Sequence, residues 1–510
     1  MSIPARETET ANTQPRESWF TRPLSGWGCV VGWCLSFGVF IGVVAAAGGP
    51  AVGDAWETIY ATWAAAHGQF ACFYPPHGPT IFTYAAPVYP LLTGGITALA
   101  QVGHGVAFPS GTALGHNCAQ AIPAMVHWSQ TGGGIVPTLR AGYLSWLALM
   151  AGLIWLLRSA GRGRSGWEPT TLLIVAVLPP VWLSYEQYFH PQDILAMGFA
   201  LAAIGCALRN QWIAAGVLIA LAAFTQQYAL LVAVPLLVVA PGRDRVRYVV
   251  AAIISAAVIS LPILALAYRS VASYVFVGSG NSSGLGGTVV WEWRLHGAPL
   301  LLMSRILPLL GSFLLSLYVV RRVGSVAARQ PALLLALIGV SLALRLVFEQ
   351  NIFAYYYLAL AVTLVVLDVV RGRIRETLVA WLIMILLVYT EGNIVVWRQF
   401  WGHDARHWIP VIVMAVALVR ILRSVLRHGV DWTVAMWGAV VVTALVMWPV
   451  ASDPISRPHS ASWPWQVILV AIGTVLAAVP LVGELRQHSR PPASSESPHQ
   501  VEPVPSPSLP

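Results

Sequence analysis

Apolar runs long enough to cross a membrane recur along most of the chain, and short polar segments separate them. A helix needs about 20 mostly apolar residues to cross the hydrocarbon core of a bilayer. The pattern therefore predicts an all-α polytopic membrane protein. The predicted spans are 27–47, 141–157, 171–185, 194–208, 249–267, 300–320, 333–348, 352–370, 377–396, 409–426, 432–450 and 465–484, with one or two more between residues 212 and 240.

Two stretches leave the topology open. Trp212–Ala240 is either one long span or two short helices that meet at Thr225-Gln226-Gln227. Tyr84–Val102 either re-enters the membrane or lies in its interface, because a full crossing would move every later arginine cluster to the outer side. Arginine-rich turns stay on the cytoplasmic side. We therefore favour two short helices, which gives about 14 spans, against 13 for one helix.

The order of the runs predicts one membrane domain between two tails. Residues 1–24 and the Pro/Ser-rich residues 487–510 have the composition of disordered cytoplasmic tails. Residues 25–486 form the predicted membrane domain, in which 48–140 make a long first outer loop. Within that loop, Ala55–His67 has the pattern of a helix lying on the membrane surface.

Composition excludes a soluble domain. Hydrophobic residues make up 57% and charged residues 10% of the chain, against about 25% charged in typical soluble domains. All 29 basic residues are Arg, which indicates a GC-rich, bacterial genome. The net charge of +9 does not indicate nucleic-acid binding, because the arginines lie in short clusters between apolar runs.

On this topology the costly polar residues gather on the outer side of the membrane. Ionisable groups near a bilayer interior face water, a partner or a substrate. The arrangement predicts a cavity that opens outward, although each residue could instead cap a helix or pair locally. The residues are Asp54, Glu57, Glu186, His190, Asp193, Gln226, Gln227, Arg294, His296, Arg345 and Glu349.

Several short motifs then resemble a known family. Asp54 stands six residues before Tyr60, and the passage continues through His67-Gly-Gln to Tyr74-Pro-Pro76. With the His190-Pro-Gln-Asp193 turn, the Thr225-Gln-Gln-Tyr228 break and Arg345…Tyr355-Tyr-Tyr357, it resembles the GT-C membrane glycosyltransferases over roughly residues 27–370. The bacterial, actinobacterial branch that uses polyprenyl-phosphate mannose is the most similar.

The resemblance implies an inverting transfer on the outer face of the cell membrane. The donor would be a polyprenyl-phosphate sugar, with mannose or another hexose or pentose, and the acceptor an envelope glycan or glycolipid. Asp54 would be the base that deprotonates the acceptor hydroxyl, as a base must reach the proton it removes. The alternative for Asp54 is the N-cap of a helix that starts at Ala55, and Glu57 is either a site residue or solvated surface.

Arginines are the expected anchors for the leaving phosphate, because their planar fork matches phosphate oxygens. Arg294, with His296 beside it, and Arg345 are the candidates. For Arg345 an ion pair with Glu349 one turn later explains the residue as well, and Arg294 between two tryptophans also fits a residue at headgroup depth.

Contacts to sugar or acceptor hydroxyls are expected from His190, Gln192, Asp193, Gln227 and Tyr355. Asp193 also fits an acid at a helix N-terminus, and Tyr355 an aromatic belt. No cofactor is expected, and a divalent ion at Glu186, His190 and Asp193 stays open, because no ligand spacing requires one.

A candidate disulfide and one rival function complete the sequence prediction. Cys72 and Cys118 both lie in the first outer loop, where a disulfide between them would restrain a segment with few anchors. The rival function is a transporter or flippase of a lipid-linked sugar, for which Thr225–Gln227 is the one polar break we find.

Overall fold

The computed structural model confirms the all-α class. It describes residues 27–46, 55–68, 87–102, 135–162, 167–176, 190–277, 302–349, 354–372, 405–428 and 463–488, with a few residues in 178–184, 295–300, 383 and 434–445. Helices account for nearly all of this part of the chain, and no strand occurs in it.

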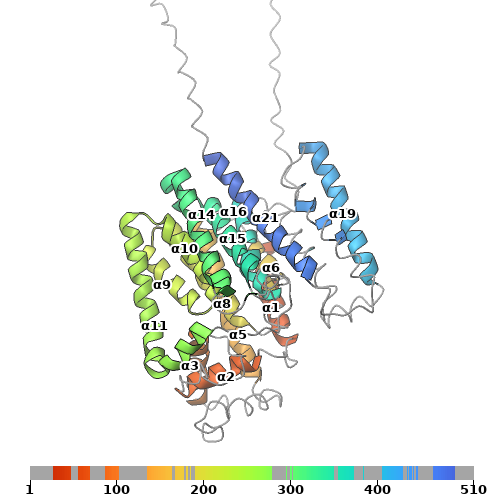
Figure 1. The fold of residues 1–510 in the computed structure, drawn as a ribbon. Coiled ribbons are helices and arrows are strands. Elements are labelled where there is room, and N and C mark those ends of the chain that lie inside the picture. The colour runs from red at the N-terminus through yellow and green to blue at the C-terminus, as the bar shows by residue number, and fades with distance from the viewer. Residues whose placement is uncertain are drawn as a thin grey trace, which may run out of the picture.

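The helices are labelled as in Figure 1. The longer ones are α1 (Trp27–Ala46), α2 (Ala55–Ala66), α3 (Val88–Val102), α5 (Ile135–Ser159), α6 (Trp167–Ala176), α8 (Pro191–Leu208), α9 (Trp212–Ala223), α10 (Leu230–Val239), α11 (Gly242–Val277), α14 (Leu307–Val323), α15 (Pro331–Phe348), α16 (Leu358–Arg371), α19 (Ala405–His428) and α21 (Trp463–His488). Short 3₁₀ turns precede α10, α15 and α16 at Gln227–Ala229, Gly324–Ala328 and Ala354–Tyr357, and a π-helix, Leu302–Ile306, precedes α14.

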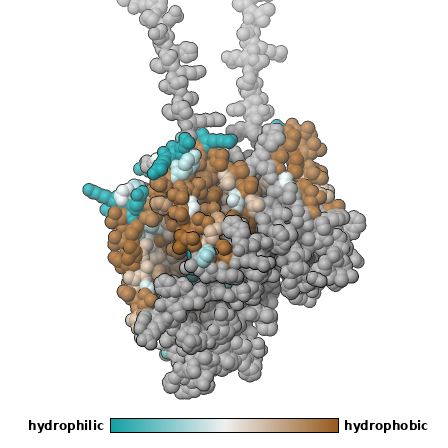
Figure 2. Space-filling view, viewed as in Figure 1, coloured by the Kyte–Doolittle hydropathy of each residue, from teal (hydrophilic) through white to brown (hydrophobic). Residues whose placement is uncertain are grey.

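Within the described ranges, five helices are long and apolar enough to cross a membrane. They are Gly142–Ser159, Pro191–Leu208, Gly242–Ala265, Leu302–Val323 and Pro331–Phe348. On α11, Ile253, Val258 and Leu261 are each at least 60% exposed, as expected of side chains that face lipid. Figure 2 shows that the described part of this face is largely hydrophobic, with hydrophilic residues along its upper edge. The protein is thus polytopic, while the total of 13 or 14 spans stays a prediction.

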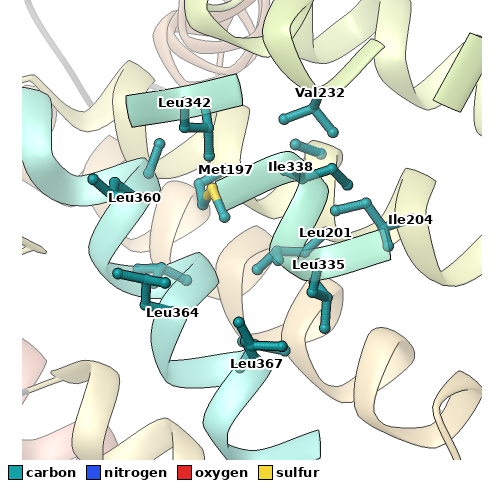
Figure 3. Packing of buried hydrophobic residues seen from close by; sticks show 14 of the residues in the cluster. Met197, Leu201, Ile204, Val232, Leu335, Ile338, Leu342, Leu360, Leu364 and Leu367 are labelled. Carbon is teal, nitrogen blue, oxygen red and sulfur yellow. The ribbon is translucent and has the colours of Figure 1, made fainter. Parts of the chain in front are cut away.

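The core forms where buried side chains of four helices meet. Met197, Leu201 and Ile204 of α8 are buried against side chains of α10, α15 and α16 (Figure 3). Glycines let α5 and α8 approach closely, since a Cβ at Gly198 would lie 2.5 Å from the carbonyl carbon of Ala148. Such small-residue contacts are typical of helices that pack within a membrane.

Residues 212–240 form two short helices, as favoured from the sequence. Trp212 at the start of α9 contacts Tyr248 of α11 with a ring-centroid distance of 6.3 Å. The Tyr248 hydroxyl donates a hydrogen bond of 3.1 Å to the carbonyl of Ala233 in α10. One residue of α11 thus touches both helices, so the chain turns back between them at residues 224–229, which we call the hinge.

The helices predicted in the first outer loop pack together. The hydroxyls of Thr62 in α2 and Thr93 in α3 lie 2.8 Å apart, and both are buried. The backbone N–H of Val88, where α3 begins, donates to the carbonyl of Phe224 at 3.0 Å. The α2–α3 pair therefore docks on the hinge; in Figure 1 it lies across the lower end of the bundle.

Arginines gather at the other end of the helices, which we call the arginine end: Arg158, Arg162, Arg209, Arg245 and Arg371. Arg162 donates to the carbonyl of Val370, and Arg245 donates to the carbonyls of Leu237, Val238 and Ala240. The last carbonyls of a helix lack partners within it, and a cation there also suits the helix dipole. These two arginines therefore close the C-termini of α16 and α10.

Candidate functional site

Ten polar or aromatic residues meet at the opposite end of the bundle, around the hinge. They come from the start of α8, the hinge, the π-helix before α14, the end of α15 and the turn before α16. We call this group the polar cluster: His190, Gln192, Asp193, Gln226, Tyr228, Arg305, Arg345, Glu349, Tyr355 and Tyr356.

Local sequence places these residues at the ends of helices. Pro191 occupies the first turn of α8, where its missing N–H costs nothing, so His190 becomes the residue just before the helix. At the hinge, Gln226 is extended and its side chain accepts a hydrogen bond from the N–H of Gln227, which starts the next turn. Both breaks place polar side chains at helix ends, where those of α8 and of the hinge can contact one another.

Asp193 joins α8 to the hinge. Its carboxylate oxygen Oδ2 accepts a hydrogen bond of 3.1 Å from Gln226 Nε2, and its backbone carbonyl accepts one of 2.7 Å from the Tyr228 hydroxyl. The side chain is only 2% exposed. Burying a carboxylate is unfavourable unless hydrogen-bond donors and cations surround it. The neighbours of Asp193 therefore stabilise a buried acid at this position.

His190 lies between Asp193 and the aromatic residues that precede α16. Its Nδ1 is 2.7 Å from Gln192 Nε2 and 3.5 Å from Asp193 Oδ2. Its ring stacks on Tyr355, with centroids 4.2 Å apart and planes at 17°. His190 therefore has a fixed ring plane, which is what a residue needs to orient a sugar hydroxyl or to hold a proton at a defined point.

Arg345 is a largely buried cation on the last turn of α15. Its Nε donates to Glu349 Oε2 at 2.9 Å, which is the ion pair that the sequence predicted as one of two roles. Its guanidinium also lies 4.6 Å from the ring centre of Tyr356 and 5.6 Å from that of Tyr228. Its side chain is 12% exposed. Aromatic faces stabilise a desolvated guanidinium, so Arg345 is held with a defined orientation.

Arg305 is a member of the cluster that the sequence analysis did not select. Its Nη1 lies 3.9 Å from Glu349 Oε1, and its side chain is 44% exposed. Glu349 therefore contacts one arginine with each carboxylate oxygen. Arg305 could have been found as an ionisable residue inside the predicted span 300–320, since such residues in spans are usually functional.

The remaining predicted site residues fall as follows. Asp54, Arg294 and His296, and the predicted disulfide partners Cys72 and Cys118, lie outside the described residues. Glu57 belongs to α2, although its side chain lies outside the described part. At the hinge, Gln226 makes the contact to Asp193, while Gln227 begins the 3₁₀ turn beside it.

Metal ligands do not gather in the cluster. Within the part of the chain that the structure describes, no group of three or more His, Cys, Asp or Glu side chains could hold a metal ion. Glu186, a member of the divalent-ion alternative, lies outside that part. The expectation of no cofactor stays a prediction.

One comparison with known proteins found a match. The model of Glycosyltransferase family 87 matches residues 141–348, which is less than half of the chain. No curated protein matched. The matched region runs from α5 to the last residue of α15 and contains most of the polar cluster, and it supports the glycosyltransferase class.

Proposed function

We propose, from that family match, that the protein is an inverting membrane glycosyltransferase that takes a sugar from a polyprenyl-phosphate donor. The observation that carries the proposal is the position of the polar cluster: a buried acid, a buried arginine and stacked aromatics lie at one end of helices that match a glycosyltransferase family. Aromatic faces and convergent polar groups are the usual means of holding a small polar ligand.

The lipid-linked donor suits the surroundings of the cluster. Three of the helices that carry it, α8, α14 with its π-helix, and α15, are long and apolar enough to cross a membrane, so a polyprenyl chain could lie in the bilayer while its phosphate reaches the helix ends. Arg345 would bind the phosphate, together with Arg294 and His296. As the bond between the sugar and the phosphate breaks, negative charge grows on the phosphate, and fixed guanidinium groups stabilise it.

Asp54 is the proposed base. It would remove the proton from an acceptor hydroxyl, whose oxygen then attacks the anomeric carbon as the polyprenyl phosphate leaves from the opposite face, so one step inverts the anomeric configuration. Helix α2 begins at the next residue, Ala55, and packs on α3, whose first N–H donates to the hinge carbonyl of Phe224. This link between the α2–α3 pair and the hinge supports the assignment.

Hydroxyl groups of the sugar or the acceptor would contact His190, Gln192, Asp193, Gln227, Tyr355 and Glu57. The stack of His190 on Tyr355 provides an aromatic edge, and the buried Asp193 carboxylate a strong acceptor. The acceptor would be an envelope glycan or glycolipid, and the sugar mannose or another hexose or pentose. The active site would face away from the cytoplasm, because the arginine end is the expected cytoplasmic side.

The first experiment measures sugar transfer by the purified protein in detergent. Radiolabelled polyprenyl-phosphate sugars and an envelope lipid extract are offered to the wild type and to Asp54→Asn. We expect transfer by the wild type and a loss of at least about 10³-fold in the variant, because the amide cannot accept the proton. Asp244→Asn is the matched control, since Asp244 pairs with Arg247 at the arginine end, 3.0 Å away.

A different outcome would favour the rival function. If the wild type consumes no donor, and labelled lipid carrier crosses proteoliposome membranes equally fast with either protein, then the protein is a flippase and the transferase proposal is wrong.

A further inference from the structure

Glu349 holds the position at which a phosphate would meet the two cluster arginines. Its Oε2 accepts from Arg345 Nε at 2.9 Å, and its Oε1 lies 3.9 Å from Arg305 Nη1. The carboxylate is only 5% exposed, and Arg345 is 12% exposed, whereas Arg305 is 44% exposed. Glu349 is thus an internal anion bound between a fixed, buried cation and one that reaches water.

Carboxylates and phosphates use the same guanidinium geometry. Both accept N–H donors from arginine, so an incoming phosphate competes directly with a carboxylate that already accepts from Arg345 Nε. The other contacts of Arg345, with the rings of Tyr228 and Tyr356, would keep its guanidinium in place while the anions exchange.

The charge of the lipid changes during the proposed reaction. A polyprenyl-phosphate sugar is a phosphodiester with one negative charge, while the released polyprenyl phosphate is a monoester that carries nearly two near neutral pH. Two arginines without a counter-charge would therefore hold the product more tightly than the donor. A competing carboxylate offsets this difference.

We propose that Glu349 is an exchangeable counter-ion that competes with the lipid phosphate for Arg345 and Arg305, and so limits how long the polyprenyl phosphate product stays bound. The inference rests on the proposed function, since it concerns the phosphate of that reaction. Arg305, the exposed partner, is the cation that first meets the phosphate. Glu349 is a positioning residue, because it acts through the two arginines.

The test is direct binding of a short-chain polyprenyl monophosphate to purified, full-length protein in detergent. Uncharged polyprenol of the same length is the reference ligand. Glu349→Gln keeps the size of the side chain and an oxygen that can accept from Arg345, but it removes the charge. We expect it to bind the monophosphate about tenfold more tightly than the wild type, with polyprenol binding unchanged.

Kinetics add a readout that a merely structural ion pair would not move. In Glu349→Gln, KM for the donor and the inhibition constant of the monophosphate should both fall, and kcat should fall as well, because product release becomes limiting. Glu349→Asp keeps the charge and should restore part of kcat. Arg305→Gln, at a half-exposed position, should weaken monophosphate binding several-fold and leave polyprenol binding unchanged.

Glu168→Gln is the matched control, because Glu168 is also a buried acid paired with an arginine, Arg158, at 2.7 Å. It lies at the arginine end and should leave monophosphate binding unchanged. The inference is overturned if Glu349→Gln binds the monophosphate no more tightly than the wild type, if it binds polyprenol more tightly to the same degree, or if Arg305→Gln has no effect. If the wild type binds no polyprenyl monophosphate, the proposed function itself fails.

Discussion

The two ends of the helix bundle use ionisable side chains in different ways. At the arginine end, Arg162 and Arg245 donate to backbone carbonyls that end α16 and α10, and Arg158, which pairs with Glu168, is 53% exposed. In the polar cluster, side chains mainly contact one another, and Asp193 and Glu349 are at most 5% exposed. The first end completes the fold, while the second holds charges where their burial is costly, as is expected of a ligand-binding site.

The two ends differ in what surrounds their ionisable side chains and not in the types of those side chains. The arginine end also contains a largely buried pair, Arg371 with Glu484, at 3.1 Å, and this pair fastens α21 to α16. Glu484 also has a second basic neighbour, His488, at 3.9 Å, but for Arg345 the second neighbour of the carboxylate is a more exposed arginine, and aromatic rings flank the guanidinium. A shared partner and open access indicate a binding site more strongly than burial alone does.

The largest effect expected between the two ends comes from replacing one arginine at each end. Arg345→Gln should lower the rate of sugar transfer by about 100-fold or more, because the buried cation that we propose binds the phosphate is lost and Glu349 loses its close partner. Arg247→Gln, at the arginine end, should stay within about twofold of the wild type, since the exposed ion pair of Arg247 with Asp244 contributes little. Transfer rates at equal amounts of folded protein check both, and equal losses would remove the distinction between the two ends.

A second comparison concerns the contact of α5 with α8, which runs between the two ends. A Cβ at Gly198 would lie 2.5 Å from backbone of Ala148, whereas a Cβ at Gly205 would lie 2.5 Å from Cδ1 of the Trp155 side chain. Backbone cannot move aside as a side chain can. Gly198→Ala should therefore cost about 2 kcal/mol of stability and Gly205→Ala less.

Thermal unfolding in detergent measures this difference. Gly95→Ala is the control, since a Cβ there meets nothing within 4 Å. A lower unfolding midpoint for Gly205→Ala than for Gly198→Ala would contradict the packing argument.

The smallest expected effect separates two buried tyrosines. The Tyr228 hydroxyl donates to the carbonyl of Asp193 at the cluster, and the Tyr248 hydroxyl donates to that of Ala233 nearer the arginine end. Replacing either by Phe should cost about 1 kcal/mol, the usual net value of a hydrogen bond. Only Tyr228→Phe should also slow transfer, by a few-fold, because it loosens the hinge beside Asp193. Unfolding midpoints measure the loss of stability in both variants, and transfer rates measure the effect on the cluster. Slower transfer in Tyr248→Phe would contradict the proposed role of the Tyr228 hydroxyl.

Hydropathy and arginine clusters were sufficient to predict the helical membrane class and the division of the α9–α10 segment. Both predictions rest on local properties of the sequence. The length of an apolar run decides whether a helix can cross the membrane, and the cytoplasmic side of the chain is indicated by Arg243, Arg245 and Arg247. Helix boundaries were less predictable. Helix α5 starts at Ile135, inside the predicted loop, and α11 extends to Val277, because helices continue past the apolar run that defines a span.

The sequence could predict most residues of the polar cluster, but it could not predict which of them contact one another. The sequence places Asp193, Gln226 and Arg345 at the same side of the membrane, yet the contact between Asp193 and Gln226 depends on how α8 and the hinge are rotated. Arg305 depends on the π-helix Leu302–Ile306, which changes the rotation of the following turn and has no simple sequence signature. The roles of Asp54 as the base and of Arg294, His296 and Arg345 in phosphate binding all stay predictions, and of these residues only Arg345 lies in the described part.

The short α9–α10 hairpin also bears on the thickness of the surrounding bilayer. With 12 residues at 1.5 Å each, α9 is about 18 Å long, well below the hydrocarbon thickness of about 30 Å, whereas α11 beside it has an apolar stretch of 24 residues. Helix α3, with Leu92 and Ile96 exposed, docks where the hairpin stops. Lipids beside the hinge therefore contact a long hydrophobic helix and a short one. If the bilayer thins to match the shorter helix, lipid headgroups move closer to the hinge. Acyl-chain length is thus a variable that could tune access to the hinge.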